Sequence, residues 1–336
     1  MAEIFFGFGS SHGPLLSSSP EHWDFRTAAD KVNPAHPYRG KNYTFDQLVA
    51  LRKGEDMAAL NRIETRRERH ARCQKQLDRL ADRLAAAAPD VIVLVGDDQH
   101  EWFKPELQPS FAVFHGESVL NTAFDAAKGK NVPAGQAEVM RDRHPSADQH
   151  YPVDTALAAR IIAQLIDDDF DVATLAREPR GAAGPIGVGH AVQFIYRRIL
   201  RDRQVPLVPI FLNTFYPPNQ PTPKRCFEFG RSIGRAIASW DSTKRVAVCA
   251  SGGLSHFVID EAFDHRIIAA LEAKDKAALL AEPGALFQSG TSEVKNWITA
   301  AGILSETKLR MQLLDYVPCY RSEAGTGNAM AFATWE

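Results

Sequence analysis

Two histidines and one glutamate have the residue types of a metal site, and each lies in a short segment that can face a shared cleft. His12 lies within Ser-Ser-His-Gly-Pro, His100 within Asp-Asp-Gln-His-Glu, and Glu293 ends Gly-Thr-Ser-Glu. Two imidazoles and one carboxylate form the ligand set of a facial-triad ferrous site, which leaves coordination positions open for substrate and dioxygen. The sequence therefore favours an iron-dependent oxygenase as the first hypothesis.

Each of these three residues also has an ordinary structural interpretation. His12 can cap a helix from its turn, and His100 can belong to a polar surface turn after a buried strand. Glu293 begins a predicted helix, where the macrodipole stabilises an acid, and for an isolated glutamate this interpretation is the stronger one. Glu261 also begins a predicted helix, so spacing alone does not choose between the two glutamates.

Two further histidines follow glycine-rich turns and could transfer protons. The segment Ser-Gly-Gly-Leu-Ser-His ends at His256, and its adjacent glycines indicate a close approach of the backbone to a ligand or another segment. A histidine there can act as a general base near neutral pH. His190 ends Gly-Val-Gly-His and opens a predicted helix, where it can contact substrate or assist proton transfer. A turn or capping histidine is the alternative for both.

The predicted strands are short apolar runs, rich in valine and isoleucine and bounded by Gly, Pro or Asp. The four clearest are 4–8, 91–95, 205–211 and 246–250, and two shorter ones are 111–114 and 170–173. In open α/β sheets, ligands collect at the carboxyl ends of the strands. Three of the four clearest strands are followed there by a Gly or Ser turn and a histidine, as a shared site requires.

Helices are predicted where apolar residues recur on one face. The longest such region is 54–88, and the others are 154–166, 191–201, 223–240, 261–270 and 292–300. The tail 325–335 begins with glycine and is then apolar, so we expect it to return to the core, whereas 121–150 looks irregular. No linker-like stretch divides the chain, and we therefore expect one domain over residues 1–336.

A long segment after the first histidine, residues 17–53, has little periodicity but many aromatic side chains. A stretch of this kind is either functional or disordered. The aromatic content favours an ordered lid over the substrate or a wall of its pocket, either in its own chain or across a homodimer interface. The candidate contacts are Trp23, Phe25, Tyr38 and Tyr43. A surface loop that packs its aromatic side chains on the body of the protein is the alternative.

The composition is that of an ordinary soluble globular protein: 336 residues, 45% hydrophobic, with a net charge of -2. The near-zero charge argues against nucleic acid as a partner. No apolar run approaches a membrane span, and the N-terminus does not have the pattern of a signal peptide. The four cysteines lie far apart and indicate reduced thiols, so we expect a cytoplasmic protein.

Taken together, these segments resemble the type II (class III) extradiol ring-cleavage dioxygenases, in the superfamily of the protocatechuate 4,5-dioxygenase β subunit. The similar motifs are Ser-Ser-His-Gly-Pro-Leu-Leu from Ser10, the region 95–103, Val-Gly-His-Ala from Val188, Gly-Gly-Leu-Ser-His from Gly252, Ser-Gly-Thr-Ser-Glu from Ser289 and Gly-Asn-Ala from Gly327. The long stretch between the first two motifs is most like the single-chain enzymes that act on 3-O-methylgallate or gallate.

The resemblance implies an α/β fold with a single αβα-layered domain and a central mixed sheet. It implies Fe(II) bound by His12, His100 and Glu293, which selects Glu293 over Glu261. His256 would be the catalytic base, and His190 would face the substrate. The implied substrate is a catechol-type aromatic acid, cleaved with O2. The side chains implied for binding it, besides His190, are Thr326, Asn328 and Arg321. We also expect a homodimer.

The sequence departs from the family pattern at the second ligand. In the family this ligand directly follows an Asn-Asp pair, whereas here Gln99 follows Asp97-Asp98, and an ungapped comparison puts Gln99 rather than His100 at the ligand position. Two other functions therefore remain open. One is a divalent-metal hydrolase that uses the same ligands, and the other is a binding protein of the same fold without catalysis.

Overall fold

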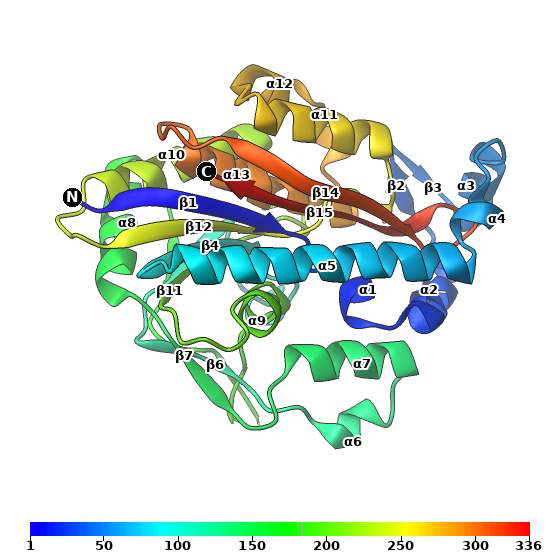
Figure 1. Cartoon of the computed structure of the whole chain (residues 1–336), viewed down its shortest axis with the longest axis horizontal. Coiled ribbons are helices and arrows are strands. Elements are labelled where there is room, and N and C mark those ends of the chain that lie inside the picture. Colours follow the sequence, from blue (N-terminus) through cyan, green and yellow to red (C-terminus); the bar gives the residue numbers. More distant parts are fainter. Residues whose placement is uncertain (183) are drawn as a thin grey trace.

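The centre of the computed structural model, which describes residues 1–182 and 184–336, is a nine-stranded mixed sheet (Figure 1). The strand order is β13-β15-β1-β12-β4-β11-β5-β8, and β14 also pairs with β15. The strands are β1 (Glu3–Ser10), β4 (Val91–Asp97), β5 (Phe111–Phe114), β8 (Ala173–Leu175), β11 (Leu207–Leu212), β12 (Arg245–Ser251), β13 (His256–Val258), β14 (Met311–Tyr320) and β15 (Thr326–Trp335).

The four strands predicted most clearly form the middle of this sheet. β1, β12, β4 and β11 are parallel neighbours, and β15 runs antiparallel to β1. Both faces of the middle strands are covered, which explains their continuous apolar runs. Because β1, β12 and β4 are parallel and adjacent, their carboxyl ends lie at one edge of the sheet.

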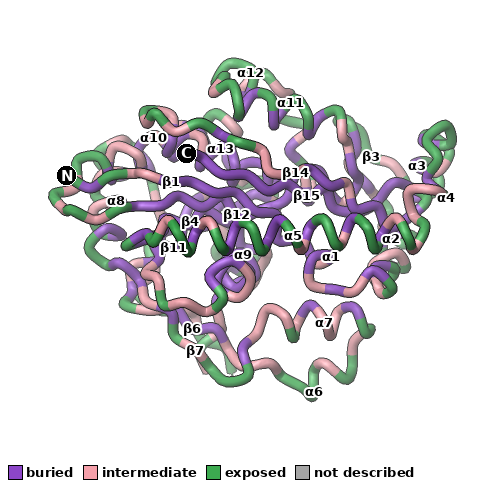
Figure 2. Tube along the Cα trace, viewed as in Figure 1, coloured by how far each residue is buried: buried purple, intermediate pink, exposed green. Residues whose placement is uncertain are grey.

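Helices cover both faces of the sheet, as the αβα prediction requires (Figure 1). On one face lie α5 (Ile63–Ala87) and α9 (His190–Phe194), and the second contains α8 (Thr155–Asp167), α10 (Pro223–Ala238), α11 (Glu261–Glu272) and α13 (Val294–Leu304). Figure 2 shows the strands buried between these layers, with exposed residues on the outer sides of the helices. Among the described residues, no helix has the length and apolar character needed to cross a membrane.

The longest helix, α5, shows why the helical predictions were accurate. Its buried face includes Cys73, Leu77, Leu80 and Leu84, at helical spacing. The helix ends where Ala88 adopts a left-handed conformation, with φ 46°. The short helix α4 (Met57–Leu60) precedes it, so the predicted region 54–88 contains two helices.

The structure differs from the sequence expectations mainly outside the central strands. The strand β14 was not predicted, and the strand expected at 170–173 lies at β8. The region 121–150 contains part of a hairpin and two helices, whose signals are weak because they are short and polar. Its elements are β6 (Ser118–Asn121), α6 (Ala126–Gly129), α7 (Ala134–Arg143) and β7 (Gln149–Pro152).

The segment 17–53 is ordered and consists of short elements. After α1 (Pro14–Ser17), it contains η1 (Pro20–Arg26), α2 (Thr27–Val32), the hairpin β2 (His36–Tyr38) with β3 (Lys41–Tyr43), and α3 (Phe45–Leu51). The other short elements are β9 (Arg180–Gly181), β10 (Gly184–Pro185), η2 (Ile195–Ile199), α12 (Lys276–Ala281), η3 (Gly284–Leu286) and η4 (Ser289–Glu293).

Candidate active site

A cavity of about 220 Å³ lies at the edge of the sheet where the middle strands end. His12 follows β1, Gln99 follows β4, and His256 follows β12, so three adjacent strand ends contribute to it. His190 enters from the start of α9, and Glu293 from the end of η4. The lining also includes Gly13, Pro14, Arg26, Glu101, Arg143, Gly253, Phe257, Asn328 and Met330.

A chain of two hydrogen bonds fixes the tautomer of His12. The Oγ of Ser251 lies 2.9 Å from the main-chain oxygen of Ala191, which can only accept, so the hydroxyl donates its proton there. Nδ1 of His12 lies 2.9 Å from the same Oγ and must therefore donate to it. Nε2 of the neutral ring is consequently left with a lone pair. This is the tautomer that a metal-binding imidazole needs.

The lone pair of His12 faces carboxylate oxygens. Its Nε2 lies 3.2 Å from Oε2 of Glu293 and 3.9 Å from Oδ1 of Asp97, and it is buried without a hydrogen-bond partner. Burial lowers the pKa of His12 to about 4, which keeps the ring neutral at neutral pH. Electron-rich atoms that converge in this way can be bridged by a cation.

Four side chains could hold that cation: His12, Asp97, His190 and Glu293. All four are buried, and one possible ligand atom from each lies within 4.8 Å of the others. Imidazole and carboxylate ligands suit several divalent transition metals, iron included. The residues therefore fit the metal that the sequence predicted, although with a different set of neighbours.

The ring of His190 is held by the carboxylate of Glu101, which is half-buried. Its Nδ1 lies 2.5 Å from Oε1 of Glu101, and its Nε2 points toward Asp97, 3.8 Å from Oδ2. Burial lowers the pKa of His190, but Glu101 and Asp97 outweigh it and raise the pKa to about 9. The charge of His190 and its hydrogen bond lower the pKa of Glu101 to about 2, against the desolvation of this carboxylate. His190 can therefore donate a hydrogen bond into the cavity.

His256 is positioned to exchange a proton through one nitrogen. Its Nδ1 donates to the carbonyl of Leu254 at 2.8 Å, and its Nε2 lies 3.1 Å from Oε1 of Glu293. Burial lowers the pKa of His256, but Glu293 outweighs it and the pKa is raised. Gly290 lies against the ring, where a Cβ would be 2.6 Å from Nε2. The ring is thus fixed in the cavity beside the possible metal ligands.

Comparison with known proteins places this geometry in a family. Residues 62–326 match the family described as the catalytic LigB subunit of aromatic ring-opening dioxygenase. The chain belongs to this LigB family. The matched region contains Gln99, His190, His256 and Glu293, whereas His12 precedes it.

The chain is also similar to curated 2,3-dihydroxyphenylpropionate/2,3-dihydroxicinnamic acid 1,2-dioxygenases. It is 28% identical to the protein from Escherichia coli (strain 55989 / EAEC) over 177 residues, 52% of this chain and 46% of that protein. It is 27% identical to the protein from Comamonas testosteroni over 169 residues, 50% of this chain and 44% of that protein. The matches therefore span less than half the length of these two relatives.

His100 does not join the other predicted ligands of this LigB-family site. Its ring stacks on Tyr216, with the ring centroids 3.5 Å apart and the planes 6° from parallel. His100 has φ 64°, and the turn after β4 brings the preceding Gln99 to the cavity instead. The Nε2 of Gln99 donates to Oε1 of Glu293 at 3.0 Å. The ungapped comparison of the sequence had indicated this register.

The two candidate glutamates, Glu293 and Glu261, lie in different surroundings. Glu293 lines the cavity and also accepts a hydrogen bond from the main-chain nitrogen of Gly253 at 2.8 Å. Glu261 instead accepts from the hydroxyl of Tyr320 at 2.7 Å and does not line the cavity. Of the two glutamates, the structure therefore places only Glu293 in the cavity, and its role as a ligand stays a prediction.

Of the three additional side chains expected to bind substrate, only Asn328 lines the cavity. Arg321 forms a two-pronged ion pair with Asp30, at 2.7 and 2.8 Å, and both side chains are buried. The hydroxyl of Thr326 donates to the same Asp30 at 2.7 Å. Their polar groups are thus engaged in holding the segment 17–53 to β15.

The aromatic side chains expected to cover the substrate do not line the cavity either. Trp23 and Tyr38 are buried elsewhere, and Phe25 packs near Gly135 of α7. The segment contributes Arg26 instead. Sequence reasoning also missed Asp97, Glu101 and Arg143. Asp97 could have been found because it ends a buried strand, but Arg143 lies in a region without a recognisable pattern.

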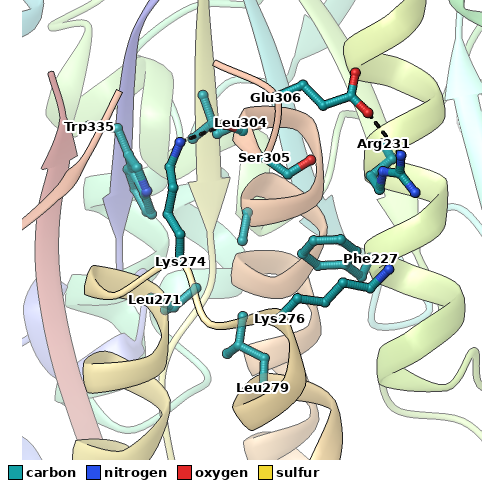
Figure 3. Close-up of a pocket in the computed structure, with 11 residues that line it drawn as sticks. Phe227, Arg231, Leu271, Lys274, Lys276, Leu279, Leu304, Ser305, Glu306 and Trp335 are labelled. Atoms are coloured by element: carbon teal, nitrogen blue, oxygen red, sulfur yellow. Dashed lines mark hydrogen bonds and ion pairs between the residues drawn. The ribbon is translucent and has the colours of Figure 1, made fainter. Parts of the chain in front are cut away.

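A second cavity, of about 270 Å³, lies between α10, α11, α12 and α13 (Figure 3). Its charged groups are already engaged: Arg231 pairs with Glu306, and Lys274 donates to two main-chain oxygens. Among the described residues that line it there is no histidine. The first cavity, in contrast, is lined by three histidines: His12, His190 and His256.

Proposed function

We propose that this chain is an extradiol ring-cleavage dioxygenase that acts on a catechol-type aromatic acid, similar to 3-O-methylgallate, gallate or protocatechuate. The observation that carries the proposal is the lone pair of His12 facing Glu293, 3.2 Å away, in the cavity that also contains His256. Membership of the LigB family supports this chemistry. The expected cosubstrate is O2, and the expected metal is Fe(II).

His12 and Glu293 would hold the iron in this proposal. The structure offers Asp97 and Gln99 for the position that the sequence expectation gave to His100. When bound, Fe(II) supplies a site at which two adjacent substrate oxygens and dioxygen can be brought together. The hydrogen bond from Ser251 to Ala191 keeps Nε2 of His12 free for this purpose.

His256 would act as the general base that accepts a proton from the substrate. Because Nδ1 is bonded to the carbonyl of Leu254, Nε2 is the atom that can take a proton from a substrate hydroxyl and return it later. His190, held by Glu101, would donate a hydrogen bond to a substrate oxygen. Asn328 lies on the opposite strand β15, where it pairs with His256, and would contact the substrate ring or its substituents.

The activity is tested by loading the protein with Fe(II) without oxygen and then measuring oxygen uptake. The substrates would be gallate, 3-O-methylgallate, protocatechuate and uncharged catechols, with ring opening followed by absorbance. His256→Ala should retain iron and bind substrate but lose about 10²–10⁴-fold in turnover. The exposed residue His150 provides a matched control, as His150→Ala should behave like the unaltered protein. Absence of oxygen uptake with every catechol, or an unaltered rate in His256→Ala, would contradict the proposal.

The metal ligands are tested separately by measuring bound iron. His12→Ala and Glu293→Ala should lose iron binding while the far-ultraviolet circular dichroism stays the same. His100→Ala should keep its iron, because this ring stacks on Tyr216 rather than facing the cavity. Loss of iron in His100→Ala would restore the ligand that the sequence predicted, and full iron occupancy in His12→Ala would remove His12 from the ligand set.

A further inference from the structure

Two arginines face the active-site cavity without an acidic partner. Arg26 ends η1 and Arg143 ends α7, and both line the cavity. Among the described residues, neither guanidinium forms an ion pair, and the Nε of each is buried without a hydrogen-bond partner. Arg143 donates one hydrogen bond, from Nη2 to the carbonyl of His12 at 2.7 Å. Most of the donors of these two groups are therefore free.

Three acidic side chains on the two segments that carry these arginines are bonded to other groups. Asp142, the neighbour of Arg143, accepts from the hydroxyl of Ser17 at 2.6 Å. Glu138 of α7 lies 2.8 Å from Nδ1 of His22. On the other side of Arg26, Asp30 is bonded to Arg321 and Thr326. The packing thus fixes both arginines in place and leaves their guanidinium groups without a direct ion pair in the described part of the chain.

The two guanidinium groups add positive charge to the cavity, and Glu101 and Glu293, which also line it, offset part of the charge of Arg143. Burial, followed by the charges of Arg321 and Arg143, lowers the pKa of Arg26 to about 10. Burial also lowers the pKa of Arg143. Both groups remain charged at neutral pH, so the repulsion between them persists. Guanidinium groups bind carboxylates through paired, charge-assisted hydrogen bonds, which are among the strongest that proteins form.

We propose that Arg26 and Arg143 bind the carboxylate of an aromatic acid and so determine the substrate class of this enzyme. The inference rests on the proposed function, because the cavity that they line is the one with His12, Glu293 and His256. It assigns the carboxylate to residues other than Arg321 and Thr326, which are bonded to Asp30. It also gives the segment 17–53 a role within its own chain, through Arg26.

The test compares two ligands that differ in charge and cannot be cleaved because they have one hydroxyl: 4-hydroxybenzoate and 4-hydroxybenzyl alcohol. Calorimetric titration would use the full chain, both as purified and after loading with Fe(II). Arg26→Met and Arg143→Met should each weaken binding of the acid by about tenfold or more, while binding of the alcohol changes little. Arg26→Lys and Arg143→Lys should retain part of the preference for the acid over the alcohol. Arg141→Met, an exposed change on the same helix α7, is the matched control.

Equal affinity of the unaltered protein for the two ligands, or no binding of the acid, would overturn the inference. An equal loss of affinity for the acid and the alcohol in the arginine variants would also overturn it. Because Arg143 also binds the carbonyl of His12, its variants are checked for iron content and thermal stability. The guanidinium of Arg26 donates no hydrogen bond to the described part of the protein. If the Arg143 variants do not fold, the Arg26 variants therefore provide the test of the inference.

Oxygen uptake separates the two proposals. Arginine-dependent binding of 4-hydroxybenzoate, without oxygen uptake on any catechol, would support the anion site and contradict the dioxygenase function. Oxygen uptake that is equal for protocatechuate and 4-methylcatechol, and equally affected in the arginine variants, would support the function and overturn the anion site.

Discussion

At the scale of single residues, the position of His256 depends on the absence of a side chain opposite it. A Cβ on Gly290 would lie 2.6 Å from Nε2 of His256, so Gly290→Ala must displace the imidazole. We expect turnover to fall by at least about tenfold, since misplacement by 1 Å can cost about 10²-fold. Gly284→Ala is the matched control, because nothing lies within 4 Å of its Cβ. Steady-state oxygen uptake measures the effect, and equal rates for the two variants would contradict this account of Gly290.

The tautomer of His12 depends on another single atom, the Oγ of Ser251. In Ser251→Ala, Nδ1 of His12 loses its acceptor and the ring can turn or change tautomer. The affinity for a divalent metal should fall by about 10–100-fold, as measured by titration with Fe(II) or Co(II). Ser10→Ala is the control, because its buried hydroxyl donates to the carbonyl of Ser11 rather than to His12. An unaltered affinity in Ser251→Ala would show that the hydroxyl does not orient the ligand.

At the scale of elements, a buried ion pair connects α2 to the end of β14. Asp30 and Arg321 are both buried, and they are joined by two hydrogen bonds. Removal of one partner leaves the other charge buried without compensation. Asp30→Ala should therefore lower the free energy of unfolding by about 3–5 kcal/mol, as measured by urea denaturation.

An exposed ion pair in the same region provides the comparison. Glu21 pairs with Arg67 at 2.8 Å, and both side chains are largely exposed. Glu21→Ala should leave the midpoint of urea denaturation almost unchanged, because water screens an exposed pair. Replacing both Asp30 and Arg321 with apolar residues should recover part of the stability lost in Asp30→Ala. Similar effects of Asp30→Ala and Glu21→Ala would contradict the structural role assigned to this pair.

At the scale of the whole molecule, Asp264 should make stability depend on pH. It is fully buried on α11, and burial raises its pKa to about 7, against hydrogen bonds from Ser255 and Tyr316. The folded chain therefore keeps a proton that the unfolded chain releases above about pH 4. As pH rises from about 4 to 7, the contribution of Asp264 falls by an amount on the order of 4 kcal/mol.

Urea denaturation at a series of pH values measures this contribution. In Asp264→Asn the free energy of unfolding should fall less steeply between about pH 4 and pH 7 than in the unaltered protein. Asp241→Asn, which changes an exposed carboxylate, should preserve the original slope. Identical pH profiles for Asp264→Asn and the unaltered protein would contradict the raised pKa.

The sequence alone determined the middle strands, the long helices and the family of the chain. The middle strands and the long helices are recognisable because burial on one or both faces imposes an apolar pattern. The strand-end turns bring His12 and His256 to one edge, because parallel neighbours end together. The choice of Glu293 over Glu261 came from the resemblance, since both glutamates begin helices and local spacing is the same for both.

Tertiary structure alone decided which neighbours share the cavity. The turn after β4 directs Gln99 into the cavity and stacks His100 on Tyr216. Hydrophobic periodicity cannot predict which of two adjacent polar residues in a turn faces the cavity. Contacts between distant segments also decided which arginine faces the cavity. Arg321 is bonded to Asp30, 291 positions away, whereas Arg143 is left facing the cavity. A local pattern cannot show which buried charge finds a partner, because that depends on contacts between segments far apart in the chain.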